Sequence, residues 1–399
     1  MMSVLAHRFE GDRLMVIVPD RLSDLIAKGE ITARYYNPGE LFKEVHLVFT
    51  NDDNPPLEAL QQTVGDAKLY VHNMPPDSRF FIRTLGWQPA LMGAWTKRMM
   101  QLAQSVKPNL IRCHGADLNA HAAAAIRQAL NIPYVVSFHI NPAQSAIVWP
   151  GGTKQKIYNF FADRLACRGL RAADLVLPVY KSIIPYLEDA GVKRYRVAYN
   201  VLGAGARSKN NFELSSPVRI ISVGRLVVGK NPENIIRALA RLPMVHLTVV
   251  GTGPLRDYLI DVASKAGVSD RCDFVKSISN KDLCDTLGQY DIFASHCDYW
   301  GLPKAVMEPL LTGLPVVMNR REGEPFAELD ELAMLVDNSA EGYEEAFGQL
   351  IASEEQRRTL GESARSKAEK LFGAVSSETS YVEIYRGLLS RGTAASAAQ

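Results

Sequence analysis

Two cations follow an apolar run in the second half of the chain at a spacing that suits phosphate binding. The run Val218–Val223 passes into Gly224-Arg225-Leu226, and Lys230 comes five residues after Arg225. Glycine permits a tight turn at a strand end. Arginine offers a planar fork of donors and lysine a point charge. Together they could hold a diphosphate without a metal, although two solvated surface cations beside a turn would give the same pattern.

A carboxylate lies in a second segment, residues 299–317. Gly301 and Pro303 precede a predicted helix that carries Glu308, Gly313 ends this helix, and a buried strand follows at 315–317. Such an acid near the ligand face of a sheet can accept hydrogen bonds from both hydroxyls of a ribose. The alternative is an ordinary solvated glutamate on a helix.

Other common cofactor and metal motifs are not found. The first strand runs into Pro19-Asp20-Arg21 rather than a glycine-rich fingerprint, and the chain has no G-x-x-x-x-G-K-[ST] phosphate loop, H-E-x-x-H or EF-hand pattern. The sequence therefore argues against a simple NAD dehydrogenase or a P-loop NTPase. We expect no metal site and no nucleic-acid partner.

The composition is that of a globular protein, with 399 residues, 47% hydrophobic and 22% charged. Five cysteines, an odd number without a two-residue spacing, favour a reducing compartment. We see no apolar signal core at the N-terminus and no membrane-length apolar run, so we expect a cytoplasmic protein. Residues 1–215 hold 25 Lys and Arg against 18 Asp and Glu, whereas the rest hold 20 against 25. This asymmetry suggests different partners for the two halves, although chance scatter is as good an explanation.

Short apolar runs closed by turn residues alternate with helical stretches throughout the chain, which is typical of buried parallel strands in a doubly wound sheet. We expect Asp117 to cap a helix ending at Leu130. We also expect helices 232–241 and 254–266, each with proline in its first turn, and helices 340–352, 354–371 and 377–389. The predicted strands are Leu14–Val18, Val45–Phe49, Lys68–Val71, Asn109–Cys113, Tyr134–Phe138, Leu175–Val179, Arg196–Tyr199, Val218–Val223, His246–Val250, Asp273–Val275, Ile292–Ser295, Pro315–Met318 and Ala333–Val336.

The polar stretch 203–216 is the best linker candidate, so we expect two Rossmann-like domains, residues 1–205 and 206–375, facing a central cleft. Residues 376–399 should form a C-terminal helix, free to cross back to the first domain, and a disordered tail, 391–399.

The motifs of the second half resemble those of a known family when taken together. They are the strand with Gly224-Arg225-Leu226 and Lys230, then Val250-Gly251-Thr252-Gly253-Pro254, then the P-K-x-V-x-E-P-x-x-x-G-x-P-V-V pattern of residues 303–317. This combination looks like the retaining GT-B glycosyltransferases, and more narrowly like glycosyltransferase family 4. The resemblance covers almost all of residues 195–372 and continues more weakly through residues 111–139 and 171–201.

The resemblance implies a nucleotide sugar, UDP- or GDP-linked, bound by the C-terminal domain as a co-substrate, with no further cofactor. It implies that Gly224, Arg225 and Lys230 hold the donor diphosphate and that Glu308 holds the ribose. Val275 and Ile278 would bound the segment beside the base. His139 would line the catalytic centre near the transferred sugar, unless it is an ordinary core histidine; His114 we interpret as structural support.

The same resemblance implies an N-terminal domain that binds the acceptor, a glycan, lipid-linked or small molecule, in polysaccharide biosynthesis. The anomeric configuration of the sugar would be retained because the acceptor attacks on the leaving-group face, with Arg225 and Lys230 stabilising the leaving diphosphate. No carboxylate nucleophile is evident. The positive first half suggests acceptor anions or peripheral contact with the inner face of an anionic membrane.

One departure from the family pattern concerns the donor sugar. The family usually has a glutamate eight residues before Glu308, and here that residue is Trp300. We expect Trp300 to line the sugar site or to pack in an interdomain core, with Asp298 or Glu324 supplying polar contacts and Gly301 and Leu302 supplying backbone donors. The family's early glycine-rich loop is also unclear, with 28–30 and 37–39 as candidates. A nucleotide-sugar epimerase, a phosphorylase of the same fold and an inactive nucleotide-sugar-binding module remain alternatives.

Overall fold

The computed structural model describes residues 12–27, 29, 31–77, 89–139, 152–200, 207–299, 301–321 and 328–397. The chain divides into two compact units. Unit 1 comprises Met1–Val201 together with Val375–Gln399, and unit 2 comprises Leu202–Ala374. None of the helices in the described part of the chain combines the length and the apolar character needed to cross a membrane.

Unit 1 is built on a six-stranded sheet in which all neighbouring strands are parallel, in the order β3-β2-β1-β4-β5-β6. Its central strands are mostly apolar, and β4 and β5 are buried at every residue, as expected for a sheet covered on both faces. The strands are β1 (Arg13–Val18), β2 (Glu44–Phe49), β3 (Lys68–Asn73), β4 (Leu110–His114), β5 (Tyr134–Phe138) and β6 (Leu175–Pro178).

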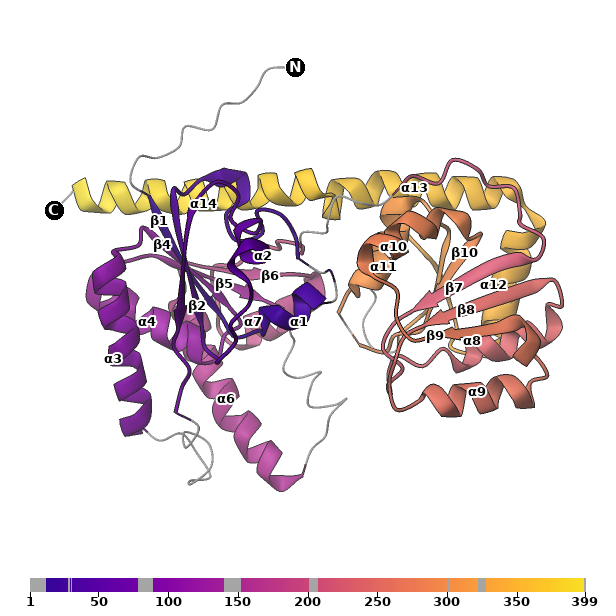
Figure 1. The fold of residues 1–399 in the computed structure, drawn as a ribbon, viewed down its shortest axis with the longest axis horizontal. Coiled ribbons are helices and arrows are strands. Elements are labelled where there is room, and N and C mark those ends of the chain that lie inside the picture. The colour runs from indigo at the N-terminus through magenta and orange to yellow at the C-terminus, as the bar shows by residue number, and fades with distance from the viewer. Residues whose placement is uncertain are drawn as a thin grey trace, which may run out of the picture. The chain divides into compact units, whose positions relative to one another are not determined.

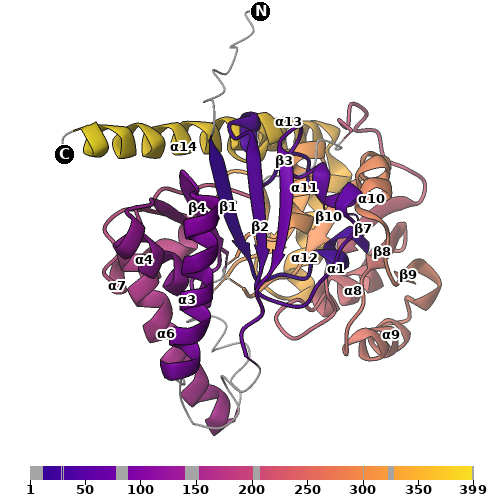
Figure 2. The same ribbon diagram turned by 60° about the vertical axis from the view of Figure 1, so that its left-hand side comes forward.

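Helices of unit 1 cover this sheet (Figures 1 and 2). Several are gathered to one side of β1 in the second view, whereas the long C-terminal helix lies across the upper ends of the strands in both views. The helices are α1 (Leu22–Ala27), α2 (Leu57–Gln61), α3 (Pro89–Val106), α4 (Leu118–Leu130), α6 (Thr153–Ala172), α7 (Ile184–Asp189) and α14 (Ala374–Ala397).

Unit 2 repeats the plan with a second parallel sheet of six strands, in the order β12-β11-β10-β7-β8-β9. The strands are β7 (Val218–Val223), β8 (Val245–Val250), β9 (Cys272–Val275), β10 (Ile292–Ser295), β11 (Val316–Asn319) and β12 (Met334–Val336). The helices are α8 (Glu233–Ala238), α9 (Arg256–Lys265), α10 (Asn280–Thr286), α11 (Lys304–Thr312), α12 (Ala340–Ala352) and α13 (Glu354–Phe372).

Both sheets have the same strand order when each is numbered from its own first strand, 3-2-1-4-5-6. The prediction of two doubly wound, Rossmann-like sheets is confirmed. In such a sheet, the second and third strands lie on one side of the first strand and the fourth to sixth strands lie on its other side. Ligands bind beyond the carboxyl ends of the strands at this reversal, between the first and the fourth strand. These points lie between β1 and β4 in unit 1 and between β7 and β10 in unit 2.

Helix α14 returns to unit 1 and closes its core, as the sequence allows. Tyr381 and Tyr385 are buried with Leu14 in one apolar cluster. At the start of the helix, Glu378 accepts two hydrogen bonds from the Arg34 guanidinium, at 2.7 and 2.9 Å. It also accepts one from the Gly39 backbone N–H, at 2.9 Å. Gly39 has φ +60° and an added Cβ would lie 2.6 Å from Val382, so this glycine is explained by helix packing.

Three local predictions differ from the structure. Helix α14 continues to Ala397, through most of the tail predicted to be disordered, because that tail is rich in alanine, the strongest helix former. Residues 196–199 form no strand, because β6 ends at Pro178, which has no N–H to continue the ladder. Asp117 precedes α4, but its side chain makes no capping hydrogen bond.

The predicted linker is only partly a free connection. Residues 207–216 have no helix or strand, yet Phe212 is fully buried and its carbonyl accepts hydrogen bonds from Arg357. Lys209 is buried too, and its Nζ donates to the Tyr290 carbonyl at 2.7 Å. This part of the stretch is therefore anchored within unit 2.

The two prolines predicted to lie in the first turn of a helix precede their helices instead. Pro232 occupies the N-cap position of α8 rather than its first turn, and Pro254 lies two residues before α9.

Candidate functional site

A pocket lies at the carboxyl ends of the neighbouring strands β7 and β10 in unit 2. This is the point at which doubly wound sheets bind ligands. It is formed by the carboxyl ends of these strands, the loops that follow them and the start of α11. Its lining includes Ser222, Gly224, Leu226, Lys230, Ser295, His296, Cys297 and Pro303.

Lys230 enters this pocket from a tight turn. The Lys230 backbone N–H donates to the Val227 carbonyl at 2.9 Å, and Gly229 has φ +78°, the left-handed conformation that such a turn requires at its third residue. A Cβ on Gly229 would lie 3.0 Å from the ring of Tyr299. The glycine thus lets the turn lie close against the loop that follows β10.

Positive charge gathers around Lys230. Burial lowers the pKa of Lys230 from its ordinary value, and the charges of Arg225 and Arg321 lower it further, against an opposing effect of the Cys297 thiol. The Lys230 Nζ lies 5.3 Å from the centre of the Tyr299 ring, whereas Arg225 is exposed. A cation that burial makes costly to keep charged gains most when an anion binds beside it. The predicted pair is therefore brought together, with Arg321 as a third cation.

The glycines of the Val250–Pro254 motif allow a close backbone approach. Gly251 and Gly253 both have φ +155°. An added Cβ would lie 1.8 Å from the Gly224 carbonyl oxygen at the first position and 2.2 Å from the Leu226 carbonyl oxygen at the second. The Leu226 N–H also donates to the Thr252 carbonyl at 2.9 Å. The motif therefore packs directly against the backbone of the Gly224–Leu226 loop.

Glu308 is buried on α11 rather than solvated, with 8% of its surface exposed. Its Oε1 accepts a hydrogen bond from Asn280 Nδ2 at 2.6 Å. Asn280 begins α10 directly after the loop that continues β9, the segment bounded by Val275 and Ile278. The structure thus places the carboxylate assigned to a ribose near the segment assigned to a base.

His139 follows β5 in unit 1, whereas the other described site residues lie in unit 2. Its ring stacks on that of His114 with 5.6 Å between centroids, and its carbonyl accepts a hydrogen bond from the Tyr180 hydroxyl at 2.9 Å. Burial, then the charges of Arg112 and His139, hold the pKa of His114 well below its usual range. A neutral, enclosed His114 fits the supporting role expected for it.

The residues proposed to contact the donor sugar are only partly described. Trp300 and Glu324 lie outside the described residues, as do Lys28 and Glu30 of one loop candidate. Leu302 is buried, and the Gly301 carbonyl accepts a hydrogen bond from Arg321 Nη2 at 3.3 Å. Although burial opposes it, contact with His296 lowers the pKa of Asp298, so this carboxyl is ionised.

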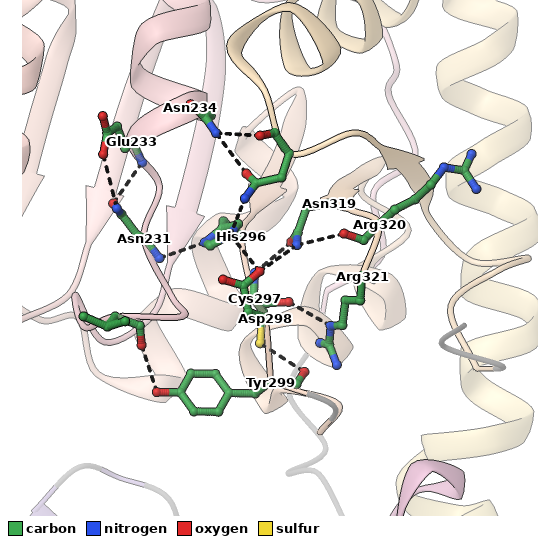
Figure 3. Close-up of polar contacts among 12 residues, drawn as sticks. Asn231, Glu233, Asn234, His296, Cys297, Asp298, Tyr299, Asn319, Arg320 and Arg321 are labelled. Carbon is green, nitrogen blue, oxygen red and sulfur yellow. Dashed lines mark hydrogen bonds and ion pairs between the residues drawn. The ribbon is translucent and has the colours of Figure 1, made fainter. Parts of the chain in front are cut away.

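Sequence reasoning missed the residues that hold the pocket wall together (Figure 3). His296 Nδ1 accepts a hydrogen bond from the Asn231 backbone N–H, its Nε2 lies 3.0 Å from Asn338 Nδ2, and Arg321 donates to the Cys297 carbonyl at 2.8 Å. The signal for His296 was present, because it follows a predicted strand as His139 does. The signal for Asn231, Arg321 and Asn338 was not, since each lies in a loop whose path depends on the neighbouring strands. Among the described residues, no group of three or more His, Cys, Asp and Glu side chains is placed to hold a metal ion.

Comparison with protein families gives one match in each unit. Residues 43–202 match the model described as Glycosyltransferase Family 4, and residues 206–367 match that of Glycosyl transferases group 1. Among curated relatives, a lipopolysaccharide core biosynthesis glycosyltransferase of Rhizobium meliloti is 33% identical over 216 residues, 52% of this chain. A GDP-mannose-dependent alpha-(1-6)-phosphatidylinositol monomannoside mannosyltransferase of Mycolicibacterium smegmatis is 30% identical over 175 residues, 41% of this chain. The chain spans 62% and 46% of the length of these two relatives.

Solved structures match over nearly the whole chain. A sucrose-phosphate synthase from Thermosynechococcus elongatus has a TM-score of 0.67 at 15% identity, covering 95% of this chain and 100% of that one. The Anabaena protein HepE, solved in complex with UDP and glucose, has a TM-score of 0.63 at 16% identity, covering 94% and 99%. At such identities these likenesses establish the fold. With a family match in each unit and this fold throughout, the chain belongs to the glycosyltransferases of GT-B fold and family 4 type.

Proposed function

We propose that this protein is a retaining glycosyltransferase that moves a sugar from a nucleotide-sugar donor to an acceptor without a metal ion. The observation that carries the proposal is the pocket at the carboxyl ends of β7 and β10, which Lys230 lines and around which Arg225 and Arg321 gather. A nucleoside diphosphate is the anionic group that such a cluster of cations suits. A UDP- or GDP-linked sugar is supported by a UDP complex of one structural neighbour and by the GDP-mannose dependence of one relative.

The chemistry follows from where charge develops. The bond between the sugar's anomeric carbon and the diphosphate oxygen breaks, which leaves an oxocarbenium-like sugar and a diphosphate with added negative charge. Lys230 and Arg225 stabilise that charge. The acceptor hydroxyl attacks on the same face, and its proton passes to the leaving phosphate oxygen, so the anomeric configuration is retained.

The remaining assignments rest on the family motifs together with local geometry. Buried Glu308 accepts hydrogen bonds from the ribose hydroxyls, and the segment Val275–Ile278 lies along the base. His139 lines the part of unit 1 that meets the transferred sugar. Gly301 and Leu302, just before α11, face the donor with their backbone groups.

The acceptor is a glycan or a lipid-linked saccharide bound by unit 1. The names of the two relatives, one acting in lipopolysaccharide core biosynthesis and one on a phosphatidylinositol mannoside, support this class of acceptor. We place the enzyme in the cytoplasm, where nucleotide sugars are consumed in polysaccharide biosynthesis.

Peripheral contact with an anionic membrane surface belongs to the same proposal. Helix α6 carries exposed Lys156, Arg164 and Arg168, with Phe160 53% exposed between them, at four-residue spacing along one stripe. On α3, Lys97 and Arg98 are exposed as well. Basic side chains beside an aromatic one favour an anionic interface, at about 1 kcal/mol for each cation near the surface.

A thermal-shift screen of UDP, GDP and their sugar conjugates tests donor binding. A donor at about 100 times its Kd should stabilise the protein by roughly 2.7 kcal/mol. Incubation of that donor with and without glycan acceptors then separates the alternatives. An epimerase gives product from donor alone, and an inactive module binds donor without turnover. Failure of every nucleotide to stabilise the protein rejects the proposal.

Flotation with phosphatidylglycerol vesicles at low and high salt tests the membrane contact. We expect binding at low salt that is lost at high salt, because screening shortens the reach of surface charges. Substituting Glu for both Arg164 and Arg168 should abolish flotation, whereas the same change at Arg358 of unit 2 should not. Absence of binding at low salt leaves a water-soluble acceptor.

A further inference from the structure

The turn that carries Lys230 is held by the loop that follows β10. Three contacts join the two segments. The Asn231 backbone N–H donates to His296 Nδ1 at 2.9 Å, and the Asp298 N–H donates to the Gly229 carbonyl at 2.8 Å. The Tyr299 hydroxyl donates to the Val228 carbonyl at 2.9 Å (Figure 3). Of these three, the contact to His296 is the one made by a buried side chain, 8% exposed, in the pocket wall.

The partners of His296 determine which ring nitrogen carries the proton. A backbone N–H can only donate, so Nδ1 must accept and carries no proton. Nε2, which then carries the proton, lies 3.1 Å from Asp298 Oδ1 and 3.0 Å from Asn338 Nδ2, an amide nitrogen that can only donate and cannot accept from that N–H. Its N–H therefore points at an ionised carboxylate, which holds the ring in this orientation.

The loop around Asp298 is itself fixed from β11. Asn319 is buried at the end of that strand, its Oδ1 accepts from the Cys297 N–H at 2.8 Å, and its Nδ2 donates to Asp298 Oδ1 at 3.3 Å. A continuous chain of hydrogen bonds thus runs from the sheet through His296 to the residue next to Lys230.

We propose that His296 is a positioning residue for the donor diphosphate: through Nδ1 it fixes the turn that aims Lys230 into the pocket. The inference rests on the proposed function for its ligand, but the placement of Lys230 can be measured without any ligand. Preorganised cations are worth more than mobile ones because no reorganisation is needed when charge develops.

Two amide substitutions distinguish the two ring nitrogens. In His296→Asn the amide lies near the place of Nδ1 and can still accept from Asn231, whereas in His296→Gln it reaches the place of Nε2. His246→Asn is the matched control, since His246 also faces an aspartate in unit 2, Asp273 at 2.8 Å, but at the amino end of β8. We expect UDP or GDP affinity to fall about tenfold in His296→Gln, the loss of one hydrogen bond, and to stay within about threefold in the other two variants.

A readout without nucleotide follows the turn itself. The ring of Tyr299 should shift the NMR signal of ¹³C-methylated Lys230, assigned by its loss in Lys230→Arg. We expect that shift to persist in His296→Asn and to disappear in His296→Gln. If His296→Gln keeps the shift and the affinity, or if His296→Asn loses both, the proposal is overturned.

The wild-type protein provides a test that needs no variant to fold. In ¹⁵N-histidine spectra near neutral pH, His296 should show an unprotonated Nδ1 and a protonated Nε2. The opposite tautomer contradicts the proposal. If the wild-type protein binds neither UDP nor GDP, the proposed function fails, while the Lys230 and His296 signals still decide the positioning role.

Discussion

The two units have the same strand order, but the charged side chains in the loops at the point where that order reverses are different. In unit 1, the loop after β1 carries Asp20 and Arg21, and the Arg21 guanidinium pairs with Asp52 at 2.6 Å. In unit 2, the loops after β7 and β11 bring Arg225, Lys230 and Arg321 together.

Arg112 of unit 1 and Lys230 of unit 2 show how differently two cations can be used. Arg112 of unit 1 is fully buried, with its guanidinium 4.9 Å from the centre of the Tyr35 ring and 4.8 Å from that of Tyr381 on α14. It donates to Ser137 Oγ and to the Tyr35 carbonyl. This cation is used for packing, whereas Lys230 faces a pocket. A shared fold therefore leaves function to the charges at its strand ends.

The largest expected effect is on turnover in unit 2. Lys230→Ala and Arg225→Ala should each lower the rate by about 10²–10³, because each removes a charge aimed at the leaving diphosphate. The free energy of unfolding should change by less than about 1 kcal/mol. Arg21→Ala, the matched change after β1, should leave turnover intact. Near-full turnover in both unit 2 variants would show that the diphosphate assignment is wrong.

Glycine-to-alanine substitutions compare the loop after β8 in unit 2 with the loop after β4 in unit 1. In Gly251→Ala the new Cβ meets the Gly224 carbonyl oxygen, so we expect a loss of about 2–4 kcal/mol in unfolding free energy together with weaker nucleotide binding. Gly115 follows β4 with φ +79° and nothing within 4 Å of an added Cβ. Gly115→Ala should cost only about 1 kcal/mol, from the left-handed backbone. Urea unfolding measures both, and equal costs would contradict the close approach at Gly251.

Trp300→Glu restores the carboxylate usual in the family. If Trp300 lines the sugar site, donor preference should change about tenfold or more while the fold survives. If it packs in a core, a buried carboxylate without a partner should cost several kcal/mol and impair folding. Competition between nucleotide sugars, together with an unfolding curve, separates the two. A stable variant with unchanged donor preference rejects both interpretations.

The smallest effect concerns a histidine pair in the sheet of unit 1. His46 Nδ1 lies 3.0 Å from His72 Nε2, and burial, then the charge of His72, lowers the pKa of His46 to about 4. Because the unfolded chain binds this proton more readily, the stabilisation is complete above pH 6.5 and is lost as the pH falls towards 4. We expect about 1–2 kcal/mol between pH 7 and 4.5. His46→Gln should flatten this dependence in urea unfolding, and His246→Gln in unit 2 should not.

The sheets could be predicted from sequence because their strands are short apolar runs ended by turn residues. Tyr134–Phe138, Val218–Val223 and Ile292–Ser295 were predicted to the residue. The errors lie where local pattern and tertiary context compete. Pro178 interrupts the ladder in which residues 196–199 were predicted to form a strand. Alanine extends α14 through a tail whose composition suggested disorder.

The candidate site was predictable in part, for a similar reason. Gly224 and Lys230 lie in the loop that follows a predicted strand and Glu308 lies on the helix before another, so their places in a doubly wound sheet are known once the strands are known. His296, Asn231 and Arg321 meet only because loops after β10, β7 and β11 converge, which depends on strand order. The contacts that support the Lys230 turn therefore depend on the folded structure of unit 2 and could not be predicted from residue spacing alone.

Hydrogen–deuterium exchange with and without UDP or GDP tests directly whether the second unit alone holds the nucleotide. The account predicts protection of backbone amides in 224–231, 251–253 and 276–280 of unit 2, with little change in 19–21 and 115–118 of unit 1, and loss of that protection in Lys230→Ala but not in Arg21→Ala. Protection concentrated after β1 and β4, or unaffected by Lys230→Ala, would contradict it.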